Sequence, residues 1–355
     1  MGVGARVSRE RESALHAPVS GLPAMPSGWI FFCTERELAR GPVAGEFLGR
    51  KLVAFRARSG SIGILDARCQ HLGADLAQGR VVEECLECPF HNWQFATDGR
   101  CKKIPQSTTI PEFARQKSYP VEVRHGLVFL WNGPKALYPL PFYEGEEAEE
   151  FVCSEPGPIE LNCPWYLVGA NSFDSQHLYS VHERVLLEAP QVRAVGEFGL
   201  SSRTVAKVGQ GTWYDRFIHS FCGPVATMTA TNWSGSLVFV RVEMERATTY
   251  GMVSLRPLEE ERVLTHIFAF LPRSRSAMAG RILDSLRTAL RLYFIRQFLK
   301  DDARRLEGIR AGALNLIDAD AELARYFQWL ARAANGIPGT TGQEVNTKNY
   351  EGVRQ

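Results

Sequence analysis

Cys69-Gln70-His71 and Cys88-Pro89-Phe90-His91, separated by sixteen residues, are the two stretches that decide the fold of the N-terminal part of this chain. Each stretch supplies one thiolate and one imidazole, two or three residues apart. In one type of two-iron cluster, two thiolates hold one iron and two imidazoles hold the other, so each loop must reach both irons. The pattern therefore predicts a [2Fe–2S] cluster. Its four predicted ligands are Cys69, His71, Cys88 and His91.

A structural zinc site is the alternative interpretation of any group of two Cys and two His. Zinc fingers usually pair Cys with Cys in one loop and His with His in the other. Here each loop is mixed, which favours a cluster with two chemically different irons. The neighbouring residues suit such loops, because Gly73 and Ala74 are small and Trp93 can shield the second loop.

Short strand-like runs surround the two loops and predict an antiparallel β domain over residues 27–135. Residues 51–55 and 62–65 alternate as strands do, and Thr97-Asp98-Gly99 and Arg124-His125-Gly126 carry hairpin-turn signals. Residues 132–158 are rich in Pro and Gly and mark the domain boundary.

The C-terminal part, residues 150–334, is predicted to be a catalytic domain with an antiparallel sheet flanked by helices. Residues 166–181 and 279–330 have helical patterns, and residues 236–242 and 263–270 are strand-like. The chain as a whole is therefore expected to be α+β. Residues 1–26 lack an apolar signal-peptide core and are predicted to be a disordered leader, and residues 335–355 a flexible tail.

A second group of metal ligands lies in the C-terminal part, in the sequence Asp174-x-x-His177-x4-His182. Two His and a more distant carboxylate form the ligand set of many non-haem Fe(II) oxygenases. A spacing of five turns two side chains about 140° apart on a regular helix. The helix must therefore bulge or end between His177 and His182 if both imidazoles bind one ion.

Together the Cys69/His71, Cys88/His91 and His177/His182 pairs resemble the Rieske non-haem iron oxygenases, whose catalytic subunits carry these two motifs in this order. The resemblance covers about residues 29–330. It implies that His177 and His182 bind the catalytic iron. It also implies that the carboxylate of Asp174 links an iron ligand to a cluster His of a neighbouring subunit.

The resemblance places Asn171 near the iron and the third ligand on a C-terminal helix. Asp302 best matches that acid, with Asp301 as the runner-up and Asp318 and Asp320 as third choices. The family often has an acid just before the Asn, and this chain departs from that pattern with Ala170 at the position.

The resemblance also implies the activity. Rieske oxygenases use dioxygen, and electrons from NAD(P)H delivered by a separate reductase or ferredoxin, to oxidise small organic substrates; their catalytic subunits form homotrimers. The loop sequences are similar to aminopyrrolnitrin oxygenase-like members of specialised metabolism, which indicates hydroxylation or N-oxygenation. Respiratory Rieske proteins have an extra Cys in each loop, and this chain has Ala74 and Phe90 there. A Rieske electron carrier without oxygenase chemistry is the alternative, and would need no second metal site.

Composition narrows the possible binding partners and the possible location of the protein. A net charge of +2 gives no reason to expect nucleic-acid binding, and no run of eighteen apolar residues predicts a membrane span. Eight Cys in 355 residues do not form a disulfide framework, so a cytoplasmic setting is expected. The arginines at 281, 287, 291 and 296 are predicted to mark the solvated side of a helix, where they could dock an acidic ferredoxin.

Overall fold

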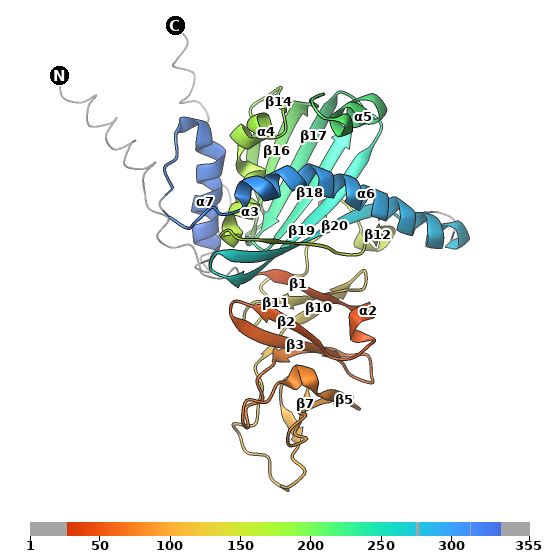
Figure 1. Ribbon diagram of the computed structural model, residues 1–355, viewed down its shortest axis with the longest axis vertical. Coiled ribbons are helices and arrows are strands. Elements are labelled where there is room, and N and C mark those ends of the chain that lie inside the picture. Colours follow the sequence, from red (N-terminus) through yellow and green to blue (C-terminus); the bar gives the residue numbers. More distant parts are fainter. Residues whose placement is uncertain (1–26, 275–276, 313, 335–355) are drawn as a thin grey trace, which may run out of the picture.

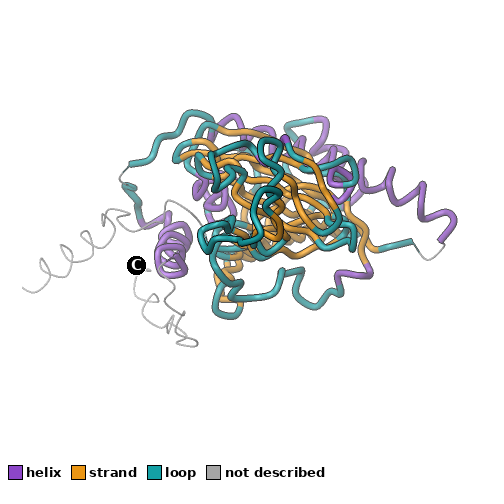
Figure 2. Tube along the Cα trace, turned by 90° about the horizontal axis from the view of Figure 1, so that it is seen from below, coloured by secondary structure: helices purple, strands orange, loops and turns teal. Residues whose placement is uncertain are grey.

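The computed structural model describes residues 27–274, 277–312 and 314–334. Small sheets occupy one end of the long axis, and one large sheet with most of the helices occupies the other (Figure 1). Seen along that axis, the strands lie in the middle and the helices around them (Figure 2). The predicted leader and tail lie outside the described residues. The predicted domain limits stay predictions.

The N-terminal part consists of three small antiparallel sheets with the orders β1-β11-β10, β2-β3-β4-β9 and β5-β6-β7-β8. Their strands are β1 Trp29–Thr34, β2 Val43–Phe47, β3 Arg50–Arg56, β4 Ile62–Asp66, β5 Arg80–Val82, β6 Cys85–Glu87, β7 Gln94–Ala96, β8 Cys101–Lys103, β9 Ser118–Tyr119, β10 Val121–Arg124 and β11 Leu127–Trp131. The predicted hairpin turn after β10 is confirmed: His125 and Gly126 have φ angles of 55° and 73°, as a tight two-residue turn requires.

The C-terminal part is built on an antiparallel sheet of nine described strands, in which β12-β20-β19-β18-β17-β16-β14 form the main path. Two further strands pair beside it, β13 with β20 and β15 with β16. The bounds are β12 Phe151–Cys153, β13 Gly157–Leu161, β14 Val185–Leu186, β15 Gln191–Val195, β16 Gly199–Lys207, β17 Val225–Trp233, β18 Leu237–Met244, β19 Thr248–Glu259 and β20 Arg262–Pro272. The α+β prediction is confirmed.

Helices α3 to α7 lie on the large sheet and at its ends, α6 crosses one face of this sheet, and α2 lies beside the small sheets (Figure 1). Their bounds are α2 Glu35–Leu38, α3 Trp165–Ala170, α4 Ser175–Ser180, α5 Trp213–Cys222, α6 Ala277–Leu306 and α7 Ala321–Ala334, with the short 3-10 turns η1 Leu76–Gln78, η2 Ala148–Glu150, η3 Asn171–Phe173 and η4 Asp318–Asp320. None of the helices within the described ranges is long and apolar enough to cross a membrane.

One helix prediction needs correction. The helical pattern over residues 279–330 is interrupted after Leu306, because Gly308 adopts a φ of 84° and turns the chain toward α7. The residues around His219 form the amphipathic helix α5, which begins at a Thr212 cap.

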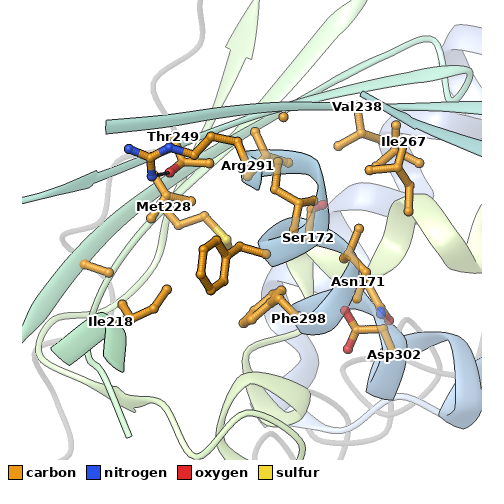
Figure 3. Close-up of a pocket in the computed structure, with 18 of the residues that line it drawn as sticks. Asn171, Ser172, Ile218, Met228, Val238, Thr249, Ile267, Arg291, Phe298 and Asp302 are labelled. Atoms are coloured by element: carbon orange, nitrogen blue, oxygen red, sulfur yellow. Dashed lines mark hydrogen bonds between the residues drawn. The ribbon is translucent and has the colours of Figure 1, made fainter. Parts of the chain in front are cut away.

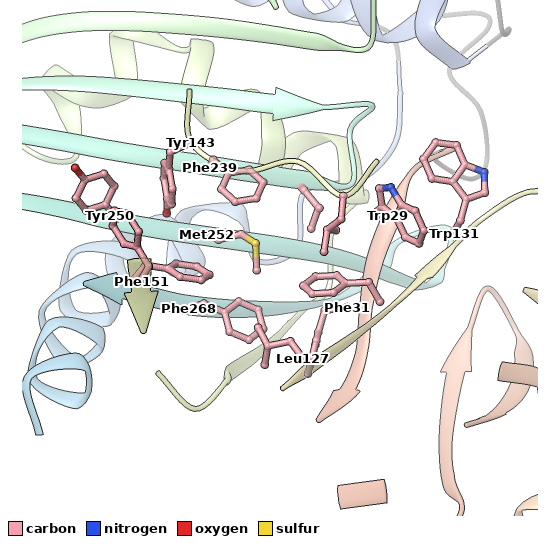
Figure 4. Close-up of a cluster of buried hydrophobic side chains, with 14 residues drawn as sticks. Trp29, Phe31, Leu127, Trp131, Tyr143, Phe151, Phe239, Tyr250, Met252 and Phe268 are labelled. Atoms are coloured by element: carbon pink, nitrogen blue, oxygen red, sulfur yellow. The ribbon is translucent and has the colours of Figure 1, made fainter. Parts of the chain in front are cut away.

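The two parts share one hydrophobic core (Figure 4). Trp29 and Phe31 of β1 pack with β11 on one side and with the large sheet on the other. The Phe31 and Phe268 rings, one from each part, meet edge to face at 5.0 Å between centroids, a favourable aromatic geometry. This shared core fixes the small sheets against the large one.

Candidate cluster loops and metal centre

The two predicted cluster loops have the same backbone geometry. Cys69 follows β4 and Cys88 follows β6. In each loop the residue four positions after the Cys donates its N–H to the Cys carbonyl, at 2.8 Å from Gly73 and 3.1 Å from Asn92. Both of these residues have positive φ angles, 75° and 56°, which Gly and Asn tolerate best. The chain therefore forms two matching turns, each presenting one Cys and one His.

The loops sort the four side chains by chemistry. Cys69 and Cys88 are buried, and their thiols are hydrogen-bonding neighbours. The His71 and His91 rings lie 4.6 Å apart between centroids. Burial, together with the neighbouring Cys88, raises the pKa of the Cys69 thiol to about 11, so a positive ion at the site is needed to hold Cys69 as a thiolate. Thiols together and imidazoles together suit a cluster with one sulfur-ligated and one nitrogen-ligated iron.

The surroundings of the His71 ring show whether the loops fit a metal cluster. Its Nδ1 atom is buried without a hydrogen-bond partner, although its ring stacks on Trp93 at 4.5 Å with only 6° between the planes. A buried nitrogen with a fixed ring and no partner suits a metal ligand. Across the described residues, no three ligand atoms of these loops converge within 4.8 Å, as one zinc ion would require. The residues therefore fit a two-iron group.

The second predicted site lies on α4 and the turn after it. His177 is in α4, and the helix ends at Ser180, before His182. The chain then reverses, with Glu183 at a φ of 52° and the Arg184 N–H donating to the Leu178 carbonyl. The prediction that the helix must end between the two imidazoles is confirmed, and the reversal brings both rings to one side.

Asp302 of α6 completes a group of three possible ligands. The ligand atoms of His177, His182 and Asp302 all lie within 4.8 Å of one another, the sole such group among the described residues. Asp302 Oδ1 is 2.7 Å from His182 Nε2 and 3.9 Å from His177 Nε2. Asp302 is buried, whereas Asp301 is exposed and pairs with Arg304.

The remaining acids considered for this role have other partners. Asp320 accepts a hydrogen bond from the side-chain amide of Gln176 at 2.5 Å and from the backbone N–H of Ile317 at 2.9 Å. Asp318 opens η4. Neither belongs to the three-residue group.

Hydrogen bonds and stacking hold the two imidazoles in place. The Nδ1 atom of His177 lies 2.6 Å from the Asp174 carbonyl oxygen, which can only accept, so this nitrogen carries the proton and Nε2 is free for an ion. The His182 ring stacks on Phe298 at 3.9 Å and 12°. Within the single chain, the Asp174 carboxylate does not bond the His177 ring; its Oδ1 accepts the first N–H groups of α4.

A cavity of about 550 Å³ opens beside the three residues (Figure 3). Asn171, Asp302 and Phe298 lie toward one end and Thr249 and Arg291 toward the other (Figure 3). Most of the wall is aliphatic or aromatic and comes from α5, α6 and the strands β16 to β20. The cavity therefore suits an apolar small molecule placed against the predicted metal site.

Sequence reasoning missed two charged features of this cavity. Arg184 is buried and pairs with Asp215 of α5 at 2.6 Å, joining the His182 turn to the cavity wall. Arg291 lines the cavity, which corrects its predicted place on the solvated side of the helix. Arg287 also lines the cavity, although its side chain is exposed as predicted. Arg296 is exposed as predicted, and the structure describes the backbone but not the side chain at 281. The sequence did contain a signal for the position of Arg291: residues eleven apart on a helix, such as Arg291 and Asp302, lie on the same face.

Comparison with known proteins agrees with this geometry. Residues 28–114 match the family model of the Rieske [2Fe-2S] domain. This part of the chain is a Rieske domain. The chain is 31% identical over 202 residues to the cholesterol 7-desaturase of Drosophila melanogaster, covering 55% of this chain and 47% of that protein. It is 32% identical over 184 residues to the aminopyrrolnitrin oxygenase of Pseudomonas fluorescens, covering 49% and 50%.

The Rieske domain and the large sheet together share the fold of dicamba monooxygenase. Dicamba monooxygenase bound to dicamba superposes with a TM-score of 0.65 at 19% identity, covering 88% of this chain and 98% of that chain. At this identity the likeness shows the fold alone. The chain matches about half the length of the curated relatives named above.

Proposed function

We propose that this protein is a Rieske-type oxygenase that uses dioxygen and externally supplied electrons to oxidise an apolar small molecule. The observation that carries the proposal is the placement of His177, His182 and Asp302 on the wall of the 550 Å³ cavity. A pure electron carrier needs neither these residues nor a cavity, so the geometry favours an enzyme. The site residues have the donor set of a non-haem iron centre, two imidazoles and one carboxylate.

When bound, iron at these residues and the cluster at the loops would supply one-electron chemistry toward dioxygen. The chain's own residues prepare the site for it. The Asp174 carbonyl fixes the orientation of His177 by accepting its Nδ1 proton, and Phe298 fixes the ring of His182. The apolar wall excludes water from the substrate, and Asn171 offers an amide beside the reacting end.

The cavity and the relatives point to the substrate class. Most of the wall is apolar, and the relatives are named as a cholesterol 7-desaturase and an aminopyrrolnitrin oxygenase. We therefore propose hydroxylation or N-oxygenation of a small organic molecule in specialised metabolism. The test is oxygen consumption with a panel of polycyclic and aromatic compounds in the presence of a ferredoxin and its reductase.

Electron delivery is proposed to run between subunits of a homotrimer, through Asp174. The Rieske loops follow β4 and β6 near one end of the long axis, while α4 lies near the other end (Figure 1). A neighbour's cluster could therefore approach His177 more closely than the chain's own. Leu72, Phe90 and Phe113 are exposed near the loops and offer apolar surface for such contact. Light scattering after size exclusion tests this, and an active monomer would refute it.

We also propose a reducing, cytoplasmic setting. All eight Cys have free thiols, and four of those outside the cluster loops are buried, Cys33, Cys85, Cys101 and Cys163. Retention of activity in glutathione-containing buffer, with no disulfide detected by mass spectrometry, is the expected result.

The decisive experiment separates the two metal sites. Replacing His177 with Ala should remove the mononuclear iron and abolish turnover, while the visible absorption of the cluster stays unchanged. His219→Ala is the matched control, because His219 lies on α5 and contacts Gln210 rather than the metal group. Loss of the cluster spectrum in the His177 variant would contradict two separate sites.

A further inference from the structure

One face of helix α6 forms part of the cavity wall. Arg291 and Asp302 are eleven residues apart on this helix and both line the cavity. At 100° per residue they lie about 20° apart around the axis, and at 1.5 Å per residue about 16 Å apart along it. The side chains between them that line the cavity are apolar: Phe294, Ile295, Phe298 and Leu299.

The guanidinium of Arg291 has no matching negative charge. Its Nη1 donates a hydrogen bond to the Thr249 hydroxyl at 2.9 Å, and no described carboxylate forms an ion pair with it. One turn earlier on the helix, Arg287 is neutralised by Asp284 at 3.0 Å. A half-buried guanidinium with one neutral acceptor and four further N–H donors is suited to bind an anion, often with two parallel hydrogen bonds.

The Arg291 end of the cavity is also its opening. Phe217, Phe221 and Leu290 line the cavity and are nevertheless 39%, 63% and 57% exposed. Leu290 is the neighbour of Arg291, and Phe217 stacks on Phe294 at 5.5 Å. A molecule in the cavity can therefore keep a charged group near water while its apolar body lies deeper, which lowers the cost of binding the charge.

We propose that the substrate is an elongated apolar molecule with an anionic group at one end, and that Arg291 binds this group. The apolar body then extends along α6, and the atom to be oxidised is the one at the far end, beside Asp302. Arg291 thus sets which end of the substrate enters first. This inference rests on the proposed oxygenase function only for the identity of the oxidised end, since the binding preference needs no turnover.

The test compares a carboxylate with its neutral ester. Pyrenebutyric acid is a four-ring hydrocarbon with a terminal carboxylate, and its fluorescence reports binding to the complete protein. With no reductant present, the acid should bind to the wild type about tenfold or more tightly than its methyl ester, as expected for a charge-assisted hydrogen bond. Arg291→Gln should remove that preference and leave the ester's affinity unchanged, whereas Arg291→Lys should retain part of it.

Arg296→Gln is the matched control, since Arg296 is exposed on the same helix and does not line the cavity. It should bind acid and ester as the wild type does. No saturable binding of the acid, equal binding of acid and ester, or an equal loss in the Arg291 and Arg296 variants would overturn the proposal. Failure of the proposed oxygenase function is detected by a different measurement: turnover would then survive in the His177→Ala variant.

Discussion

Asp174 caps α4 and is proposed to carry electrons between subunits, and two substitutions distinguish the observed role from the proposed one. Its Oδ1 accepts the N–H groups of Gln176 at 2.9 Å and His177 at 3.2 Å, so it caps α4. Loss of such a cap costs about 1 kcal/mol, and Asn caps as well as Asp. For a part of this size, 1 kcal/mol corresponds to about 2–4 °C in melting temperature. Asp174→Ala should therefore melt about 2–4 °C lower, and Asp174→Asn within about 1 °C of the wild type.

The proposed electron bridge responds differently, because it needs the charged carboxylate rather than the cap. Both Asp174 variants should lose activity about tenfold or more, the usual effect of removing a partner of a metal ligand. The assay is stopped-flow reoxidation of the reduced cluster by dioxygen in the presence of substrate, together with calorimetric melting. Wild-type reoxidation in Asp174→Asn would refute the bridge, and equal melting of the Ala and Asn variants would refute the cap.

Three further changes test the site and its surroundings. Asp302→Asn should lose the mononuclear iron and keep the cluster, as measured by iron content and visible absorption, while Asp301→Asn should lose neither. Asp215→Ala leaves a buried guanidinium unpaired and should cost about 3–5 kcal/mol in urea unfolding, against about 1 kcal/mol or less for Glu188→Ala, whose ion pair is exposed. Burial lowers the pKa of His266 to about 3, so the unfolded chain binds a proton below about pH 6.5 that the folded chain does not. Stability should therefore fall between pH 6.5 and 3, and His266→Gln should reduce the fall in melting temperature between pH 7 and 5.

The cluster loops could be predicted because their ligation is local. A Cys and a His must lie two or three residues apart to reach both irons, so the requirement is visible in the sequence itself. The end of α4 could also be predicted, since two His five residues apart cannot share an ion on a regular helix. Local geometry decides both features.

The third residue of the proposed metal site could not be assigned from local sequence, because its position depends on tertiary packing. The side chains of Asp301 and Asp302 point in directions about 100° apart around α6, and the sequence alone allows either to point toward the histidines. The packing of α6 against the large sheet determines the rotation of the helix, and it buries Asp302 while leaving Asp301 in solvent. The sequence ranked Asp302 first through its resemblance to a family, and the structure supplies the physical reason for its position.

The position of Arg291 on α6 was predicted wrongly for the same reason. Four basic residues in one helix predict a solvated face when the helix is considered alone. The helix crosses the open face of the sheet, and its N-terminal half reaches the cavity mouth, so Arg291 turns inward to Thr249 while Arg296 stays in solvent. The two arginines therefore differ in exposure only because the cavity lies beside Arg291 and not beside Arg296.

One rigid helix therefore carries both a predicted metal ligand and the proposed anchor for the substrate. Because Asp302 and Arg291 belong to the same α6, their separation is fixed by the helical rise and not by the adjustment of a loop. The distance from the bound anion to the oxidised atom would then be a constant of the helix, and substrates differing in length by a few carbons would be oxidised at different positions. Selectivity for position would follow from α6, and selectivity for shape from the strands and from α5.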